Sequence, residues 1–193
     1  FTLRERGKIR PIKSMHISDR VVQRSACDNI YIPLLQPCLI HDNGASMKNK
    51  GIDFTRKRLD MHLHKFYRET GSNDGYILLI DCSKFFDNIR HDMLIDMAKE
   101  QIKDPDLLKF FISMINQFEV DVSYMTEDEY ENCMEMIYNS LEARKIPKEK
   151  LIGEKYMKKS LGIGSQISQI CGVYYPTKID TYCKVVKSLK YYA

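Results

Sequence analysis

The sequence predicts a mixed α/β protein of the α+β kind, in which helices pack on a small, mostly antiparallel sheet. Three observations predict it. The first residues alternate between basic and apolar around a glycine, as in a hairpin. A short apolar run, Tyr76–Cys82, has the length and composition of a buried strand. Several helix-start signals follow that run, so helices make up most of the remaining chain.

Composition restricts the class of protein. The 193 residues are 44% hydrophobic and 29% charged, which is typical of one or two globular domains and not of a disordered or fibrous chain. No run approaches about 18 apolar residues and no apolar block follows the basic start, so we expect neither a membrane span nor a signal peptide. A net charge of +4 permits a nucleic-acid partner without requiring one.

The six cysteines carry no metal-site or disulfide pattern. No two are spaced as C-x-x-C, and none has a zinc-like spacing to a histidine. We therefore expect reduced thiols packed as small hydrophobic groups in a cytoplasmic protein. His62 and His64 lie two apart on an expected helix and point to different faces, so no metal site is expected there.

The first third of the chain predicts a hairpin and two helices. Two strands in residues 1–15 would be joined by a turn at Glu5–Lys8. Ser18 or Asp19 would cap a helix that ends near Pro33. Residues 41–46 are rich in turn formers, and Gly71 would end a second helix. The expected apolar stripe of the first helix is Val22, Ala26 and Ile30. That of the second helix is Leu59, Leu63, Phe66 and Tyr67.

The later part predicts four more helices. One begins near His91, and another follows the cap and first-turn proline of Asp104–Pro105. The pattern of Thr126–Glu129 fits a capping box. A last helix runs from about Ser168 toward Val186 and is disturbed at Pro176. In the helix after Asp104–Pro105, the expected apolar positions are Leu108, Phe111, Ile112 and Ile115. In the helix after Thr126–Glu129, they are Tyr130, Met134, Ile137 and Leu141, and Arg144 and Lys145 stand at its end.

Asp81 is the one charged residue of the expected strand Tyr76–Cys82, and it lies at the carboxyl end. A carboxylate at the end of a buried strand costs free energy unless a cation or a hydrogen-bond donor pairs with it. Mg²⁺ is one such partner because it prefers carboxylate and phosphate oxygens. The residues alone leave open a second possibility, in which Asp81 caps the next turn or pairs with a lysine.

Residues 80–89, Ile-Asp-Cys-Ser-Lys-Phe-Phe-Asp-Asn-Ile, resemble the first catalytic motif of bacterial-lineage reverse transcriptases, which include group II intron, retron and diversity-generating retroelement enzymes. The resemblance implies that Asp81 binds both catalytic Mg²⁺ ions and that the Cys82 carbonyl binds one of them. It also implies that Phe86 blocks a 2′-hydroxyl and so selects deoxynucleotides. The alternative for Phe86 is ordinary core packing.

Two N-terminal segments resemble the same family. Gly7–Ile12 followed by Asp19–Gln23 is similar to the fingers motif K-x-R-P continuing to D-R-V-V-Q. The resemblance implies that Arg10 binds the triphosphate, with a second cation from Arg4 or Lys8; forked arginine donors suit that role. A solvated basic hairpin is the alternative. Residues 42–51 resemble the family's second motif, near template and nucleotide.

The third match, residues 163–169, reads I-G-x-x-x-S-Q where group II intron relatives read Q-G-x-x-x-S-P, and it is similar to the diversity-generating retroelement type. The resemblance implies that this segment lies against the nucleotide, where Gly164 would permit a close approach of the backbone. Ile163 in place of a polar residue removes a hydrogen-bonding group, so we expect altered fidelity.

The resemblance implies fingers at 1–74 and 99–160 and part of a palm at 75–98 and 161–193, without a thumb. Residues 119–159 form an expected insertion that either contacts template RNA or is a solvated surface. The family's Y-x-D-D motif would follow a segment like Lys190–Ala193 and is not in the sequence. We therefore expect a fragment with negligible polymerase activity of its own, because two-metal chemistry needs carboxylates on both sides of the ion pair.

The expected function of the full-length parent is RNA-directed DNA polymerisation, in which a primer 3′-hydroxyl attacks a dNTP with two Mg²⁺ ions bound. Its partners would be template RNA, a DNA or RNA primer and dNTP, in a bacterial or phage-associated cytoplasmic setting. The alternative is a non-catalytic, maturase-like RNA-binding module. A palm-like nucleotide cyclase is a third class, which the K-x-R-P hairpin and the I-G-x-x-x-S-Q segment argue against.

Overall fold

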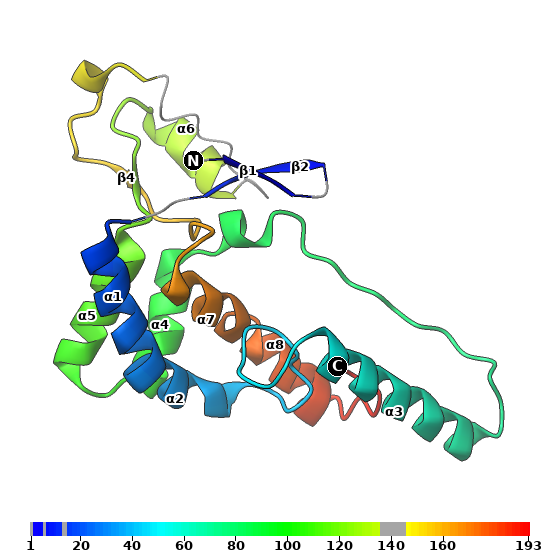
Figure 1. Cartoon of the computed structure of the whole chain (residues 1–193). Coiled ribbons are helices and arrows are strands. Elements are labelled where there is room, and N and C mark those ends of the chain that lie inside the picture. The colour runs from blue at the N-terminus through cyan, green and yellow to red at the C-terminus, as the bar shows by residue number, and fades with distance from the viewer. Residues whose placement is uncertain (1, 6, 13–14, 136–145) are drawn as a thin grey trace.

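The computed structural model describes residues 2–5, 7–12, 15–135 and 146–193, and it is mostly helical (Figure 1). Its helices are α1 (Ile17–Ala26), α2 (Ile32–Leu35), α3 (Ile52–Thr70), α4 (His91–Gln101), α5 (Pro105–Asn116), α6 (Glu127–Glu135), α7 (Gln166–Tyr174) and α8 (Thr177–Thr181). Shorter or wider helical turns are η1 (Cys27–Tyr31), η2 (Gln36–Cys38), η3 (Phe85–Asn88), η5 (Lys148–Lys150) and η6 (Tyr182–Val186).

The strands form two separate antiparallel pairs. β1 (Thr2–Glu5) pairs with β2 (Lys8–Pro11), and β3 (Val120–Asp121) pairs with β4 (Tyr156–Met157). The expected N-terminal hairpin is confirmed, with Glu5 opposite Lys8 and Gly7 in the left-handed region at φ 79°. The core, however, consists of helices packed on helices, so the expected layer of helices on one sheet is not formed by the described residues.

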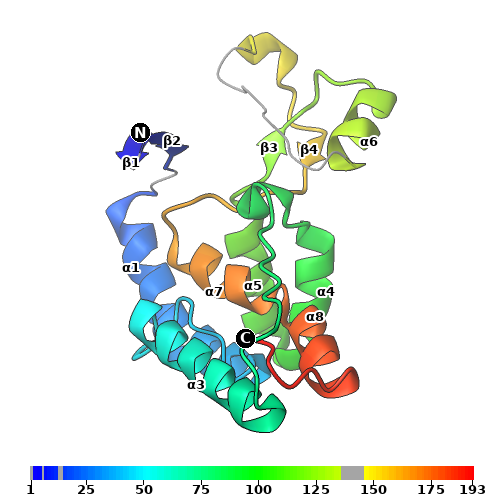
Figure 2. The ribbon, with the colours of Figure 1, turned by 90° about the vertical axis from the view of Figure 1, so that its right-hand side faces the viewer.

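α7 is the central helix. Figure 2 shows it between α1 on one side and α4 on the other. Its buried residues include Ile167, Ile170 and Cys171. The Tyr174 hydroxyl donates a 2.8 Å hydrogen bond to the Met97 carbonyl and so joins α7 to α4. This helix positions the segment before it, residues 161–165, against the rest of the molecule.

The first helical stretch differs from the prediction in its start, its end and its buried face. It begins at Ile17, where His16 and not Ser18 or Asp19 is the N-cap, and it continues through η1 and α2 to Leu35. Pro33 does not end it; the proline stands in the first turn of α2, directly after the π-helical turn η1. Val22 is exposed, whereas Ala26 is buried as expected. The π-helical turn η1 shifts the face that meets the core, whose buried members are Gln23, Ala26, Cys27, Tyr31 and Leu35.

α3 ends as predicted but does not bury the predicted stripe. Gly71 follows its last residue in the left-handed conformation, at φ 69°, and its N–H donates to the Tyr67 carbonyl. Leu59, Leu63 and Tyr67 are exposed, and the buried residue of this helix is His62. Of the predicted stripe, Phe66 alone is half-buried, with its ring centroid 5.7 Å from that of Tyr191, and His62 packs through polar contacts.

The prediction of a buried strand at Tyr76–Cys82 is wrong for the described structure. The segment runs from α3 to η3 without strand pairing (Figure 1), and its side chains are exposed, Leu79 by 88%. A strand needs a partner for its backbone N–H and C=O groups. The described residues provide none beside this segment, so the apolar run remains in contact with solvent.

The predicted starts of α4, α5 and α6 are confirmed. The Asp104 carboxylate accepts hydrogen bonds from the backbone of Asp106 and Leu107, and Thr126 and Glu129 form the expected capping box. α5 buries Phe111 and Ile115 and half-buries Leu108 and Ile112. The expected positions Ile137, Leu141, Arg144 and Lys145 lie outside the described residues. α7 begins at Gln166, two residues before the expected start, and Pro176 separates it from α8.

All six thiols are free. Cys27 and Cys171 are buried, as expected for small hydrophobic groups, whereas Cys82 is exposed. In the parts of the chain that the structure describes, no helix combines the length and apolarity needed to span a membrane.

Candidate functional site

Residues 161–165, just before α7, contact two of the segments that the sequence singles out. Ile163 forms a parallel bridge with Ile12, directly after β2, so the N-terminal hairpin is joined to this segment through the backbone. Gly164 is exposed and has φ 112°, a conformation that residues with a side chain rarely adopt. The backbone at Gly164 is therefore accessible, whereas the Ile163 side chain beside it is half-buried.

A buried polar contact ties α1 to the same segment. The Ser165 hydroxyl donates a 2.9 Å hydrogen bond to the amide oxygen of Gln23, and both side chains are buried. A buried polar group without a partner is costly, so each residue stabilises the buried position of the other. Gln23 is the last residue of the D-R-V-V-Q segment, and Ser165 follows Gly164.

Phe86 contacts the same segment and the helix that follows it. Its backbone carbonyl accepts a 2.8 Å hydrogen bond from the Leu161 N–H. Its ring rests on α7 at Gly172, where an added Cβ would come within 2.9 Å of the ring. Phe85 packs against it with ring centroids 5.6 Å apart, and both rings are half-buried. Core packing thus accounts for part of the surface of Phe86.

Asp81 and Cys82 precede these rings and are exposed. Figure 2 shows the β1–β2 hairpin to one side of the extended segment that carries them. Within the described ranges, no group of three or more His, Cys, Asp or Glu side chains is placed to hold a metal ion. Asp81 and the Cys82 carbonyl by themselves do not supply the octahedral set of ligands that Mg²⁺ requires.

The cationic residues of the hairpin are positioned by its register. Arg4 in β1 lies opposite Ile9 and is exposed. Lys8 and Arg10 stand in β2 opposite Glu5 and Leu3. The structure connects this hairpin to Ile163 through the bridge that follows β2.

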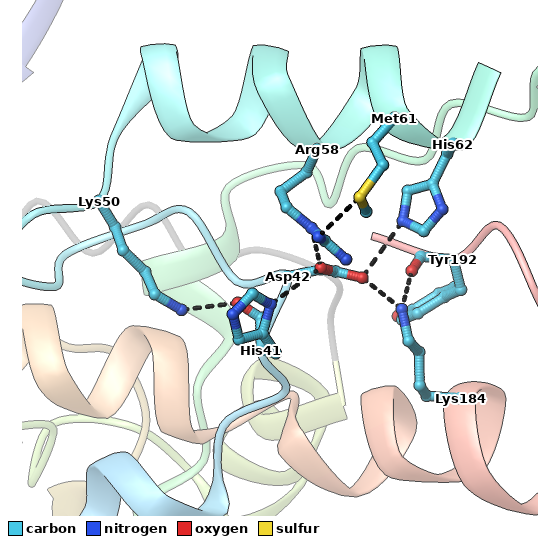
Figure 3. Close-up of polar contacts among 8 residues, drawn as sticks. All are labelled: His41, Asp42, Lys50, Arg58, Met61, His62, Lys184 and Tyr192. Atoms are coloured by element: carbon cyan, nitrogen blue, oxygen red, sulfur yellow. Dashed lines mark hydrogen bonds and ion pairs between the residues drawn. The ribbon is translucent and has the colours of Figure 1, made fainter. Parts of the chain in front are cut away.

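A second polar centre surrounds Asp42, and Figure 3 shows its contacts. The Asp42 side chain is only 1% exposed. It forms ion pairs with Arg58 of α3 and Lys184 of η6, and His62 of α3 lies 3.2 Å from its second oxygen. The neighbouring His41 ring contributes a 3.3 Å contact. One carboxylate thereby joins the loop after η2 to two helical elements.

The partners of Asp42 determine its charge state. Burial by itself raises the pKa of this carboxyl group, but hydrogen bonds from Arg58, Lys184, His41 and His62 outweigh it and hold the pKa well below its ordinary value. Asp42 is therefore ionised at neutral pH, with Arg58 and Lys184 paired to it. Removal of either partner would leave a buried charge that is less well compensated and would destabilise the fold.

Sequence reasoning missed the Asp42 cluster. The sequence places Asp42 in a turn-rich loop that resembles the family's second motif and places His62 near His64 on an expected helix, but it does not predict that Asp42 and His62 meet. A usable signal was the spacing of Arg58 and His62, which are four apart and so share one face of a helix. The third helical partner, Lys184, is 142 positions from Asp42 and leaves no local signal.

The Gln23–Ser165 contact makes a measurable prediction. Gln23→Met or Ser165→Ala should each lower the free energy of unfolding by about 1–3 kcal/mol, because each leaves one buried polar atom without its partner. The double variant should cost clearly less than the sum of the two single variants, as measured by urea denaturation. Additive costs would contradict the contact.

Comparison of this chain with family models, with curated proteins and with solved structures finds no match.

Proposed function

We propose that this chain forms the fingers and part of the palm of an RNA-directed DNA polymerase of the reverse transcriptase type. The supporting observation is the meeting of three separate sequence segments at residues 161–172. Ile12 and Gln23 of the first segment contact Ile163 and Ser165, and Phe86 contacts Leu161 and Gly172. Segments that serve one nucleotide site must meet in this way, although they are far apart in the sequence.

The proposed roles follow from this arrangement. The exposed backbone at Gly164, with Ile163 beside it, would lie against the incoming nucleotide, and Phe86 would exclude the 2′-hydroxyl of a ribonucleotide. Arg10, with Arg4 or Lys8, would bind the triphosphate from the hairpin, because multiple cations are needed for that charge. Asp81 and the Cys82 carbonyl would contribute part of an Mg²⁺ site whose remaining ligands are not among the described residues. Bound Mg²⁺ supplies charge stabilisation in phosphoryl transfer.

The domain limits, partners and setting belong to the same proposal. Fingers at 1–74 and 99–160 and palm at 75–98 and 161–193 would bind template RNA, a primer and dNTP in the cytoplasm of a bacterium or phage host. The second candidate is a non-catalytic RNA-binding module. It is favoured by one observation, that the exposed Asp81 has no group of metal-ligating side chains around it in the described part of the chain.

The test compares the binding of nucleic acid and of nucleotide by the 193-residue chain. A fluorescent RNA template with an annealed DNA primer should bind with an affinity that falls as salt rises, because phosphate contacts release counterions. Arg10→Ala should weaken the binding of dNTP, because it removes a cation proposed to bind the triphosphate, whereas Lys109→Ala, which changes an exposed lysine of α5, should not. Photocrosslinking should label the chain with a radioactive dNTP in preference to the matching rNTP, and Phe86→Ala should reduce that preference.

The outcomes separate the two candidates. RNA binding without nucleotide crosslinking would support the RNA-binding module and contradict the polymerase proposal. No binding of RNA or nucleotide would contradict both. We expect no robust Mg²⁺-dependent primer extension by this chain alone, and extension would show that Asp81 has other catalytic partners than those proposed.

A further inference from the structure

Residues 76–80, Tyr-Ile-Leu-Leu-Ile, form an exposed apolar arm between α3 and η3. Each of the five side chains is at least 63% exposed, and none carries a charge. Figure 1 shows the arm as an extended path that runs apart from the helices. Single exposed apolar residues are ordinary on a protein surface, but five in succession mark a surface that another molecule covers.

The arm is held at both of its ends. Before it, Gly75 lies against Phe66 of α3, where an added Cβ would come within 2.9 Å of the ring. After it, Phe86 of η3 packs on α7 at Gly172. A segment that is already stretched between two fixed points loses little further freedom when it pairs. The arm is therefore preorganised for a partner strand.

Both the backbone and the side chains of the arm are available for pairing. In the described structure no strand lies beside it, so its N–H and C=O groups form the kind of unpaired edge to which another strand can add. The exposed surface of the arm is on the order of 800 Å², about what each partner contributes to an interface of standard size. A strand that pairs along the arm thus gains backbone hydrogen bonds and buries a large apolar area.

We propose that the arm pairs with the arm of a second copy of this chain, as two antiparallel strands related by a two-fold axis at Leu78. This arrangement places Tyr76 opposite Ile80, and an aromatic side chain opposite a β-branched one stabilises a sheet. Ile77 then faces Leu79, and Leu78 faces its own counterpart. A two-fold pair closes on itself, so the product is a dimer and not a fibre.

The charges beside the arm favour the antiparallel arrangement. Asp74 precedes the arm and Asp81 follows it. In a parallel pair each aspartate would face its own counterpart, and like charges opposite each other are destabilising. In the antiparallel pair Asp74 faces Cys82 and Asp81 faces Gly75, so no carboxylate opposes another. The arm has no charged side chain that would select a different protein, whereas every copy of the chain presents this same surface.

The test is the mass of the 193-residue chain in solution, measured by sedimentation velocity from about 0.1 to 100 µM, because interfaces of this size bind with micromolar or higher affinity. The mass should rise with concentration from 22.7 kDa toward twice that value. Leu78→Lys should keep the chain at the lower mass, because two lysines would face each other at the two-fold axis. Ile152→Lys, which adds the same charge at an exposed apolar residue after η5, is the matched control and should dimerise as the unaltered chain does.

A mixing experiment tests the register. Ile77→Lys and Leu79→Glu should each remove most of the dimer, because each places a charge against an apolar side chain. An equimolar mixture of the two variants should restore a dimer with one copy of each, since the lysine then faces the glutamate. Hydrogen exchange provides a readout that does not depend on mass. The amides of residues 76–80 should be protected at high concentration and unprotected in Leu78→Lys.

The outcomes decide the inference without deciding the proposed function. A mass that stays at 22.7 kDa at every concentration would overturn it, and so would a dimer that Leu78→Lys leaves intact. Aggregates of no fixed size would overturn it as well, because a two-fold pair closes. The pairing ends at Ile80 and leaves Asp81 outside it, so the binding of nucleic acid and nucleotide is tested separately.

Discussion

Replacement of Tyr31 by alanine should lower the free energy of unfolding by about 3–5 kcal/mol, the range for removal of a large buried aromatic side chain. Tyr31 is fully buried in η1, and its ring centroid lies 5.4 Å from that of Phe111 in α5. Its hydroxyl donates a 2.8 Å hydrogen bond to the Leu107 carbonyl. The substitution removes the packing contact between the first helical stretch and α5 and leaves a cavity in its place. Because small domains have only about 5–15 kcal/mol of stability in total, a large share would be lost.

Two variants control this experiment. Tyr31→Phe keeps the ring and removes only the hydrogen bond, so its cost should be about 1–3 kcal/mol. Leu59→Ala removes a comparably apolar side chain from the exposed face of α3 and should change stability by no more than about 0.5 kcal/mol. Urea denaturation followed by circular dichroism measures all three. A cost for Tyr31→Ala as small as that for Leu59→Ala would show that α5 does not pack on η1.

Stability should fall steeply between about pH 9 and pH 12. Burial, with a smaller contribution from Cys27, raises the pKa of Tyr31 from 10.0 to about 12. Burial raises the pKa of Tyr174 from 10.0 to about 12 and that of the Cys27 thiol from 9.0 to about 12. In this interval the folded state keeps protons that the unfolded state has released. The stabilisation is thus complete below the unfolded pKa values and is lost as pH rises through the folded ones.

The urea midpoint as a function of pH measures this effect. It should stay nearly constant between pH 7 and pH 8.5 and then decline with each further step in pH. Tyr174→Phe removes one titrating hydroxyl and should make the decline between pH 10 and pH 12 shallower, although it also loses the hydrogen bond to Met97. A parallel decline in the variant would mean that the Tyr174 hydroxyl is not buried as described.

Local signals in the sequence predicted local structure well. The alternating basic start, the Asp104 cap, the Thr126–Glu129 capping box and the stop at Gly71 each depend on residues within one turn, and each is confirmed. The predictions that were wrong are those that depend on which other segment a residue packs against. Tyr76–Cys82 has the composition of a strand, but composition does not supply a neighbouring strand, and none lies beside it in the described structure. The stripe of α3 was predicted to be buried, yet polar contacts of Arg58 and His62 decide which face packs.

The candidate site was predictable only in part, for the same reason. Sequence motifs selected Ile163, Gly164 and Phe86, and the structure joins their segments to one another and to Ile12. The hydrogen bond of Gln23 with Ser165 and the ion pair of Asp42 with Lys184 could not be found from spacing. In both cases the chain must fold before the partners meet, and the local sequence around one residue does not indicate which distant residue it will contact.

The large sequence separation of these two contacts determines when they can form during synthesis of the chain. Gln23–Ser165 and Asp42–Lys184 each join residues 142 positions apart. At about 5–20 residues per second, a ribosome needs roughly 7–28 s to add the second residue after the first has been synthesised. During that time α1 and the loop after it leave the exit tunnel without their partners, and their buried faces stay open to chaperones and proteases. Much of this fold must therefore assemble late in translation, and slow codons placed early in the message would lengthen the vulnerable interval only if they fall between the paired positions.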